Sequence, residues 1–416
     1  MNLPELKGWI HNCALESSCH TKKIPFSKSL EWNYDNEVIT HKSNRFFKVI
    51  GVEWENSKNT HQQLLMDQWE IGTLGFILHR NKNGNEILIQ AKVEPGNVGL
   101  AQIAPTCQAT RSNLDQVHGG DLPLFALFFS DKSKNTLSVS LQSEQGTRFF
   151  NKRNKNVIVV ENKKLPTPPN FKWVKVRLLC QALAQNYLVN TDSRSVLVTS
   201  DWQKLVRDEI FNQKDKFVQE LKRSYLTNTN ILSSKKILSL LNKLSENSPK
   251  TITIPIGKVK SFTSGNTEIN SKNKDGFKII HIKVQTKNRE IEKWDQPFIK
   301  SYKSGNYILY SGRFNKILYF CFELWEEPGL YNHVELGPLR SSLTRGKTIK
   351  SCWQSDEGGR FFKDKSKYSL IDVGQIKKFN KNLIWLNLKQ VQELSMREGI
   401  FCNEARSAIS LILSMI

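Results

Sequence analysis

An internal repeat limits what this chain can fold into. The triplet Glu94-Pro95-Gly96 recurs as Glu327-Pro328-Gly329, at an offset of 327 − 94 = 233 residues. Before it, Ile24-Pro25 recurs at positions 254 and 255, an offset of 254 − 24 = 230. After it, Arg148-Phe149-Phe150 recurs at positions 360 to 362, an offset of 360 − 148 = 212. Matches in the same order along both halves indicate two copies of one structural unit.

The two copies differ in one region. The drop in offset means that the first copy carries 233 − 212 = 21 additional residues between Pro105 and Arg148, around Val117-His118-Gly119-Gly120. The sequence PTCQATRSN that starts at Pro105 corresponds to PLRSSLTRG in the second copy, which starts at Pro338. We therefore expect the first copy to keep an active site and the second to be reduced.

Residues 90–113 of the first copy combine turn formers with hydrogen-bonding side chains. Pro95 and Gly96 predict a turn. A surface loop is the ordinary interpretation of such a composition. The amide, hydroxyl and guanidinium groups are also of the kinds that bind a sugar or a phosphate. These candidate binding residues are Asn97, Gln102, Thr106, Gln108, Thr110, Arg111, Ser112 and Asn113.

The positive charge of the chain suggests nucleic acid, but its distribution does not. Sixty-one Lys and Arg against 39 Asp and Glu give a formal charge of +22. The lysines are dispersed among asparagines, as in NKNGN, FNKRNKN and NSKNKDG, and no basic helix, zinc-finger spacing or aromatic RNA-binding motif accompanies them. We expect a solvated basic surface that attracts a charged nucleotide diphosphate, and no nucleic-acid partner.

Cysteine usage and hydropathy bear on the compartment. The seven cysteines include no CxxC pair and no Cys/His spacing typical of zinc, so we expect reduced thiols and no metal. The first residues show no secretory signal, and no apolar run approaches the length of a membrane span. These features predict a soluble cytoplasmic protein without a membrane partner.

Local patterns predict an α+β module in each copy. Strands are expected at 46–54, 73–78, 86–92, 122–129, 137–141 and 157–160, with a hairpin turn at Asn83-Gly84. Apolar spacing predicts a helix over 173–185, and Thr191 or Asp192 is a plausible N-cap for the next one. Helices are expected at 201–225 and 231–244. The predicted organisation is an N-terminal arm (1–23), a first repeat (24–200), a helical connection (201–248) and a second repeat (249–416).

Several longer motifs resemble one enzyme family. QAKVEPGN, APTCQATRSN and VHGG in the first copy, and REIEKWDQP and VELGP in the second, are similar to the signature of the NDP-hexose 2,3-dehydratases. The resemblance covers roughly residues 24 to 416. The chain departs from the family pattern in two places. In the first copy, residues 61–64 keep only Gln63 of the tryptophan-and-proline segment found in the second copy. In the second copy, the proline loop lacks the expected Thr-Val-Gln. The resemblance implies a Nudix-like fold for each repeat and a homodimer, although the Nudix hydrolase box is absent from both copies.

The resemblance also implies a reaction. Family members eliminate water across C2 and C3 of a nucleotide-linked 4-keto-6-deoxyhexose, usually a deoxythymidine diphosphate sugar, to give a 3,4-diketo-2,6-dideoxyhexose. The reaction needs no cofactor, and the sequence contains neither a dinucleotide-binding glycine loop nor a P-loop. The reactive product implies a pathway partner, a 3-ketoreductase. The elimination itself needs a base at C3, an acid for the C2 hydroxyl and a group that stabilises the C4 enolate.

Three residues are candidates for this chemistry. His118 has an ordinary pKa suited to acid or base work, is followed by two glycines that let a substrate approach, and lies at the insertion, although a loop histidine without chemistry is equally consistent. Glu94 is a second candidate, but Glu327 keeps its place, which favours a structural role in the turn. Arg111 is suited to binding a diphosphate or the enolate oxygen. Trp294 and Gln296 are further binding candidates, with a buried tryptophan as the ordinary alternative.

Two other functions remain open. One is another nucleotide-sugar enzyme on the same scaffold. The other is a non-catalytic basic protein that binds nucleotide or nucleic acid, whose affinity would fall steeply with salt.

Overall fold

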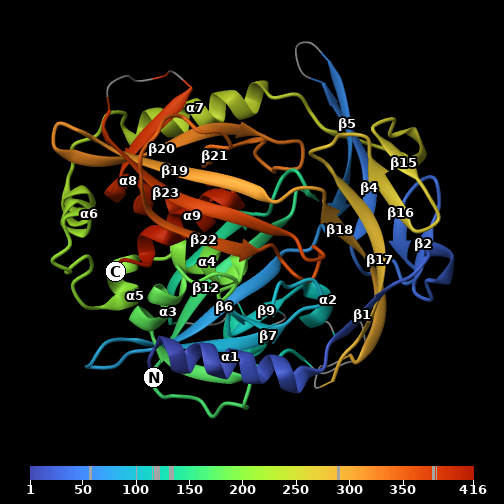
Figure 1. The fold of residues 1–416 in the computed structure, drawn as a ribbon, viewed down its shortest axis with the longest axis horizontal. Helices are drawn as coiled ribbons and strands as arrows, with labels where there is room; N and C mark the ends of the chain where they lie inside the picture. The colour runs from blue at the N-terminus through green and yellow to red at the C-terminus, as the bar shows by residue number, and fades with distance from the viewer. Residues whose placement is uncertain are drawn as a thin grey trace.

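The fold consists of four mixed β-sheets with helices between and around them. The computed structural model describes residues 1–55, 59–99, 101–114, 116, 122–130, 135–287, 291–376, 380 and 382–416. Within these residues, none of the helices is long and apolar enough to cross a membrane. The two termini lie at the ends of the first and the last helix, α1 (Leu3–Ser17) and α9 (Asn403–Leu413) (Figure 1).

Apart from β9, which has no counterpart strand in the second, the two larger sheets have the same strand order and pairing directions. In the first, β12 pairs with β6 in parallel and every other neighbour is antiparallel; in the second, β23 and β19 form the parallel pair. The registers repeat the sequence offsets, since Asn154 lies opposite Gly72 and Ser366 opposite Gly305. The first sheet contains β6 (Gly72–His79), β7 (Glu86–Val93), β8 (Ala101–Ala104), β9 (Cys107–Ala109), β10 (Thr136–Ser143), β12 (Arg153–Glu161) and β13 (Phe171–Lys175). The second contains β19 (Gly305–Phe314), β20 (Ile317–Glu326), β21 (Val334–Gly337), β22 (Lys347–Ser355), β23 (Lys365–Gln375) and β24 (Leu383–Asn387).

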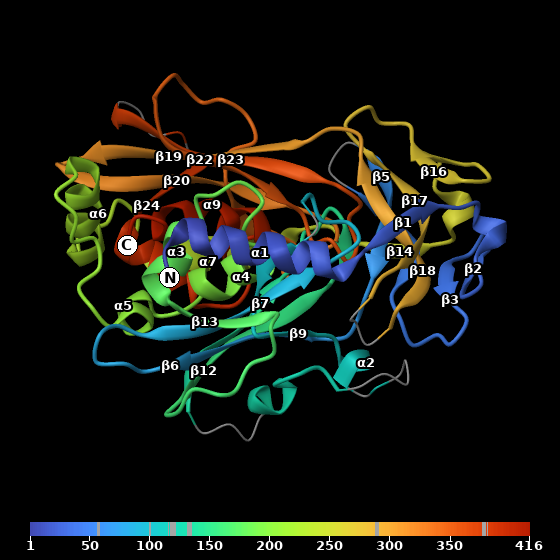
Figure 2. The same ribbon diagram turned by 60° about the horizontal axis from the view of Figure 1, so that its bottom comes forward.

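Helices fill the space between these two sheets. Figure 2 shows α4 (Thr191–Val198) and α9 between the two sheets, and each contacts the other and the sheet of its own half. Arg194 and Arg406, one on each helix, are fully buried. Arg194 donates to the Leu183 carbonyl and to Ser410 Oγ, both at 2.8 Å, and Arg406 donates from Nε to Ser195 Oγ at 2.8 Å. These arginines, which stand 406 − 194 = 212 residues apart at equivalent positions of the two copies, therefore join the two helices and have a structural role.

The two smaller sheets exchange one strand. The strand β1 (His20–Lys23) comes before the first repeat but pairs with β17 of the second, and β14 (Ile252–Ile254) pairs with β4 of the first. Figure 1 shows β1 beside β17. The other strands of these sheets are β2 (Trp32–Tyr34), β3 (Ile39–His41), β4 (Lys48–Glu55), β5 (Thr60–Asp67), β11 (Phe149–Phe150), β15 (Phe262–Ser264), β16 (Glu268–Ser271), β17 (Phe277–Gln285) and β18 (Lys293–Ser301).

Backbone contacts at the two Glu-Pro-Gly turns interlock the halves. The Gly96 amide donates to the Gly358 carbonyl at 2.9 Å, and the Gly329 amide donates to the Gly146 carbonyl at 2.8 Å. A Cβ on Gly96 would lie 1.7 Å from the Phe361 carbonyl oxygen, and one on Gly329 would lie 1.8 Å from that of Phe149. Each turn therefore needs glycine because it packs directly on the backbone of the other half.

Several local predictions need correction. The helix predicted over 173–185 is shorter in the structure. Residues 171–175, which include Trp173, pair with β7 and form the strand β13, so the helix α3 (Val176–Ala182) begins only after them. The N-cap of α4 is Asn190, which accepts from the Ser193 amide at 2.8 Å. Residues 122–129 contain a 3₁₀ turn (Ala126–Phe129) in place of a strand. The Asn83-Gly84 hairpin is confirmed, with His79 opposite Glu86.

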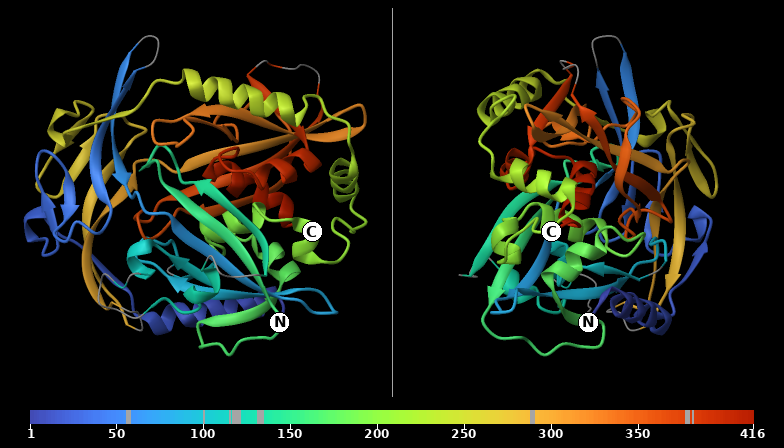
Figure 3. Two further views of the ribbon diagram at one scale, coloured as in Figure 1. Left: turned by 180° about the vertical axis from the view of Figure 1, so that it is seen from behind. Right: turned by 60° about the vertical axis from the view of Figure 1, so that its left-hand side comes forward.

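The N-terminal segment and the connection between the halves are largely helical. Residues predicted as an arm form α1, which contacts β7 and β8 of the first large sheet. The helix expected over 201–225 is broken into α5 (Trp202–Val206) and α6 (Lys216–Leu226), since Arg207 adopts a left-handed conformation with φ of 70°. The next helix, α7 (Ser234–Asn247), lies with α6 at the periphery (Figure 3), and α8 (Leu388–Ser395) follows β24.

We predict that Gly96→Ala and Gly329→Ala each destabilise the protein by about 3 kcal/mol or more, because the added methyl group overlaps the backbone of the other half. Gly8→Ala is the matched control. It lies in α1 with nothing within 4 Å of the added Cβ, so stability should rise by up to about 1 kcal/mol. Urea unfolding of the three variants would measure this, and equal stabilities would contradict the interlocking role.

Candidate functional site

A cavity of about 720 Å³ lies where three of the sheets meet. One wall is the first large sheet and the loop after it, including Lys92, Thr106 and Gln108. A second wall comes from β2, β3 and the residues beside them, and a third from β18 in the second half. The volume is within the range of pockets for small molecules and cofactors.

Four of the candidate binding residues within 90–113, namely Thr106, Gln108, Thr110 and Asn113, line this cavity. Thr110 Oγ1 donates to Asn113 Oδ1 at 2.6 Å, and Asn190 Nδ2 donates to Gln108 Oε1 at 3.2 Å, so these groups are held in place from within the protein. The buried Thr106 hydroxyl accepts from the Ile77 amide at 3.1 Å and donates to the Leu88 carbonyl. Thr106 therefore fastens the loop to the sheet, while Gln108, Thr110 and Asn113 offer polar edges to a ligand.

Glu94 lines the cavity, whereas two neighbouring candidates lie behind its wall. Glu94 is buried and its Oε1 lies 3.2 Å from Lys92 Nζ. Asn97 is buried against Gly358, and Gln102 Nε2 donates to the Tyr187 carbonyl at 3.0 Å. Neither Asn97 nor Gln102 is among the cavity-lining residues.

The second half contributes Trp294 and Gln296 to the same cavity. Trp294 Nε1 donates to Gln296 Oε1 at 3.1 Å, and Gln296 Nε2 donates to the Gly359 carbonyl at 2.6 Å. The sequence motif WDQP therefore completes a site in the other half of the chain.

The side chains of the two leading catalytic candidates, Arg111 and His118, lie outside the described part of the chain. Arg111 and Ser112 begin the short helix α2 (Arg111–Leu114), at the cavity, but their side chains lie outside the part of the chain that is described. His118 lies entirely outside the described residues.

Sequence reasoning missed a group of buried charges at the cavity. Burial lowers the pKa of Lys152 to about 8, and burial together with Glu94 raises the pKa of Glu357 to about 7. Asp192 has a raised pKa because it is buried near other carboxylates. Glu144 accepts hydrogen bonds from Asn154 Nδ2 at 2.5 Å and from Asn403 Nδ2 at 3.0 Å. Glu144, Lys152 and Glu357 lie in the loops next to strands and Asp192 lies in α4, and single charged residues at such places carry no sequence signal that would have identified them.

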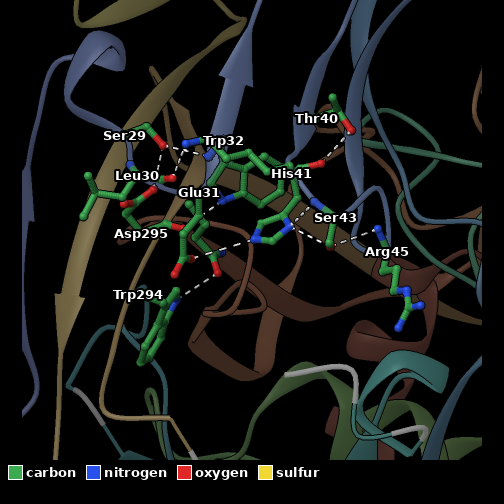
Figure 4. A network of polar contacts seen from close by, with 12 residues as sticks. Ser29, Leu30, Glu31, Trp32, Thr40, His41, Ser43, Arg45, Trp294 and Asp295 are labelled. Carbon is green, nitrogen blue, oxygen red and sulfur yellow. Dashed lines mark hydrogen bonds and ion pairs between the residues drawn. The ribbon is translucent and has the colours of Figure 1, made fainter. Parts of the chain in front are cut away.

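A second polar group, on the β2–β3 wall, was also missed (Figure 4). Glu31 and His41 both line the cavity, and Glu31 Oε2 lies 3.9 Å from His41 Nε2. Asp295 of β18 holds this wall, because Ser29 Oγ and the Leu30 amide donate to its carboxylate at 2.7 and 3.1 Å. The Asp295 carboxylate also contacts the buried His281, whose Nε2 lies 2.7 Å from Oδ1.

In the second half, larger side chains stand where the first half lines its cavity. By strand register, Trp325 corresponds to Lys92, which lines the cavity of the first half. The guanidinium of Arg340 lies 3.6 Å from the centre of the Trp325 ring, and its Nη2 donates to Glu327. The half-buried Tyr307 and the buried Tyr368 pack in the same region, with ring centres 5.1 Å apart. The second half is therefore filled by its own aromatic and charged groups.

We predict that Glu335 makes the protein less stable as pH rises. Burial raises its pKa to about 7, so the folded state keeps a proton that the unfolded state releases near its ordinary value of 4.5. Stability from this group is present at pH 5 and declines through pH 7, by on the order of 1–3 kcal/mol. Glu335→Gln can still accept from Ser143 Oγ, so its melting temperature should fall less between pH 5 and 8. Glu37→Gln, at an exposed site, is the control; a wild-type slope in Glu335→Gln would contradict this assignment.

Comparison with known proteins gives one consistent match. The family described as NDP-hexose 2,3-dehydratase matches residues 3–199, 235–346 and 339–412. The chain is 28% identical over 444 residues to a dTDP-4-dehydro-6-deoxy-alpha-D-glucopyranose 2,3-dehydratase of Saccharopolyspora spinosa, covering 99% of this chain and 91% of that protein. Proteins of the same name from Amycolatopsis orientalis and Streptomyces violaceoruber are each 26% identical, covering 99% and 91% of this chain and 90% and 89% of theirs.

Proposed function

Because this chain belongs to the NDP-hexose 2,3-dehydratase family, we propose that it acts on dTDP-4-keto-6-deoxyglucose in deoxysugar biosynthesis. It removes water across C2 and C3 and gives the 3,4-diketo-2,6-dideoxy sugar. The observation that carries this proposal is similarity over nearly the full length of three relatives with this activity in their names. The enzyme is a carbon–oxygen lyase.

The cavity supports this chemistry in two ways. It is large enough for a sugar nucleotide's reactive end, and both polar and ionisable groups line it. The 4-ketone acidifies the C3 hydrogen, so the protein must supply a base there and a positive or hydrogen-bonding group at the C4 oxygen. From the sequence, His118 is the first candidate base, and Arg111 is the candidate that stabilises the enolate or the diphosphate.

The described contacts favour a structural role for Glu94. It is ion-paired with Lys92, and its counterpart Glu327 is likewise paired with a cation, Arg340. A carboxylate kept at the same turn in a half whose cavity is filled serves the fold. Gln108, Thr110, Asn113, Trp294 and Gln296 remain the candidates for contact with the substrate.

Three further features belong to the same proposal. The matching sheets support two tandem repeats, 24–200 and 249–416, joined by 201–248, and family resemblance suggests a Nudix-like fold for each. We also propose a homodimer in the cytoplasm, without a cofactor or metal. The unstable product requires a reductase that acts at C3.

We predict turnover when the purified protein is incubated with dTDP-4-keto-6-deoxyglucose without added metal or nicotinamide. Mass spectrometry and proton NMR should show loss of one water or the breakdown product of the diketo sugar. Intact substrate with a raised melting temperature would place the activity on another nucleotide sugar. Neither turnover nor stabilisation, together with salt-sensitive binding of nucleic acid, would support a basic binding protein instead.

We predict that His118→Ala lowers kcat by about 100-fold or more, the usual contribution of a general acid or base. Arg111→Ala should raise KM or lower kcat, depending on whether the guanidinium holds the diphosphate or the enolate oxygen. Lys7→Ala, an exposed site on α1, is a suitable control and should keep wild-type kinetics. Wild-type kinetics in His118→Ala would remove His118 from the reaction.

A further inference from the structure

We propose that Glu31 is the general acid that protonates the departing C2 hydroxyl, with His41 as the hydrogen-bond donor that orients that hydroxyl. This inference rests on the proposed dehydratase function and deepens it. Arg111 and His118, which follow β9, are the candidates for the C4 oxygen and the C3 base. The inference adds the acid at C2 and places it on the β2–β3 wall of the cavity.

The geometry fixes both the position and the tautomer of His41. Its ring meets Trp32 and Phe46 edge-on, with ring centres 5.4 and 4.5 Å apart and interplanar angles of 85° and 79°. The Ser43 amide donates to His41 Nδ1 at 3.1 Å, and Ser43 Oγ, which accepts from the Arg45 amide at 3.3 Å, lies 2.8 Å from the same nitrogen and can direct its own proton to it. Because Nδ1 accepts a hydrogen bond, the neutral ring carries its proton on Nε2, the atom that faces Glu31.

Glu31 is fixed by its neighbours along the chain. Asp295 accepts from Ser29 Oγ and the Leu30 amide, and the Trp32 indole Nε1 donates to the Asp295 carbonyl at 2.8 Å. Residues on both sides of Glu31 are therefore anchored to one strand of the other half. The separation of 3.9 Å between Glu31 Oε2 and His41 Nε2 is longer than a hydrogen bond, and it allows both atoms to contact a single substrate oxygen.

The electrostatics suit these roles. Burial, followed by the nearby Asp295 carboxylate, raises the pKa of Glu31, so this carboxyl keeps a proton more readily than an exposed one. Burial lowers the pKa of His41; the Asp295 carboxylate opposes this shift and the Lys42 ammonium adds to it. Because the net shift is downward, the ring is neutral near pH 7. A neutral imidazole donates a hydrogen bond without giving up its proton, so the proton that leaves with the hydroxyl comes from Glu31.

The pair is confined to the half that has the cavity. Trp32 lies opposite His41 in β2 and β3, and Phe262 lies opposite Ser271 in β15 and β16. At the same offset of 230 residues, Ser261 replaces Glu31 and Ser271 replaces His41, while an aromatic residue is kept at 32 and 262. A purely structural pair would be expected in both halves, as Arg194 and Arg406 are. The packing residue is retained and the two ionisable residues are not.

The proton and electron balance follows from these roles. A base removes the proton from C3, and the electron pair moves through the enolate of the 4-ketone. It then forms the C2–C3 double bond as the C2–O bond breaks. The hydroxide takes the proton of Glu31 and leaves as water. Return of one proton to C2 and loss of one from the C3 enol oxygen give the diketone. The freed carboxylate regains a proton from solvent.

Glu31→Gln tests the assignment because it separates removal of the C3 proton from departure of the C2 hydroxyl. The amide keeps the size and a hydrogen bond but cannot donate an acidic proton, so kcat should fall about 100-fold or more while KM changes little. The base is untouched. Substrate recovered after incubation of the variant in D₂O should therefore carry deuterium at C3, detected by proton NMR and mass spectrometry. His41→Gln should lower kcat and likewise retain C3 exchange.

Controls distinguish this proposal from its premise. Glu37→Gln, exposed on the same hairpin, should keep wild-type rates, and unchanged binding of dTDP would show that the variants are folded. Wild-type turnover by Glu31→Gln, or loss of both exchange and elimination, would overturn the assignment while leaving the dehydratase function standing. Absence of turnover by the wild-type protein would overturn both. If Glu31→Gln does not fold, Glu31→Asp should retain elimination at a reduced rate, and Glu31→Ser, the residue of the second half, should eliminate no water yet still exchange at C3.

Discussion

The cavity depends on backbone contact between the two halves of the chain. Each Glu-Pro-Gly turn donates its glycine amide to a loop carbonyl of the other half and packs so closely that a Cβ would overlap the backbone. The exchange of β1 and β14 extends this contact to the smaller sheets. Because the halves interlock, Trp294, Asp295 and Gln296 of the second half stand in the wall of the first half's cavity.

This arrangement separates residues that hold the fold from residues that do chemistry. Charged groups where the halves meet tend to occur in both, as with the half-buried Arg148 and Arg360, whose guanidinium groups stack on Phe277 and Phe47. Such groups stabilise an interface that has approximate twofold character. The groups found only in the first half, Glu31 and His41 among them, are under no such structural requirement. Their asymmetry therefore points to function in a way that burial alone does not.

The sequence predicted some of the local structure and missed other parts for identifiable reasons. The Asn83-Gly84 hairpin was predicted correctly, because its turn chemistry is local. The spacing around Trp173 was helical, yet hydrogen bonds to β7 made residues 171–175 a strand, since sheet pairing overrides propensity. Of the predicted binding residues, Thr106, Gln108, Thr110, Asn113, Trp294 and Gln296 line the cavity, whereas Asn97 and Gln102 lie behind its wall. The face to which a side chain points depends on packing that the local sequence does not contain.

The sequence by itself determined the repeat offsets, the positions of the Glu-Pro-Gly turns, and the family, because each of these is written in residue identities at fixed spacings. Only the tertiary structure decided which residues meet. Glu31 and Asp295 are separated by most of the chain, and no short motif relates them. Their proximity results from the pairing and exchange of strands between the halves, which brings β2 and β3 beside β18. Long-range backbone pairing is the physical source of the site, and it becomes visible only when both halves are folded together.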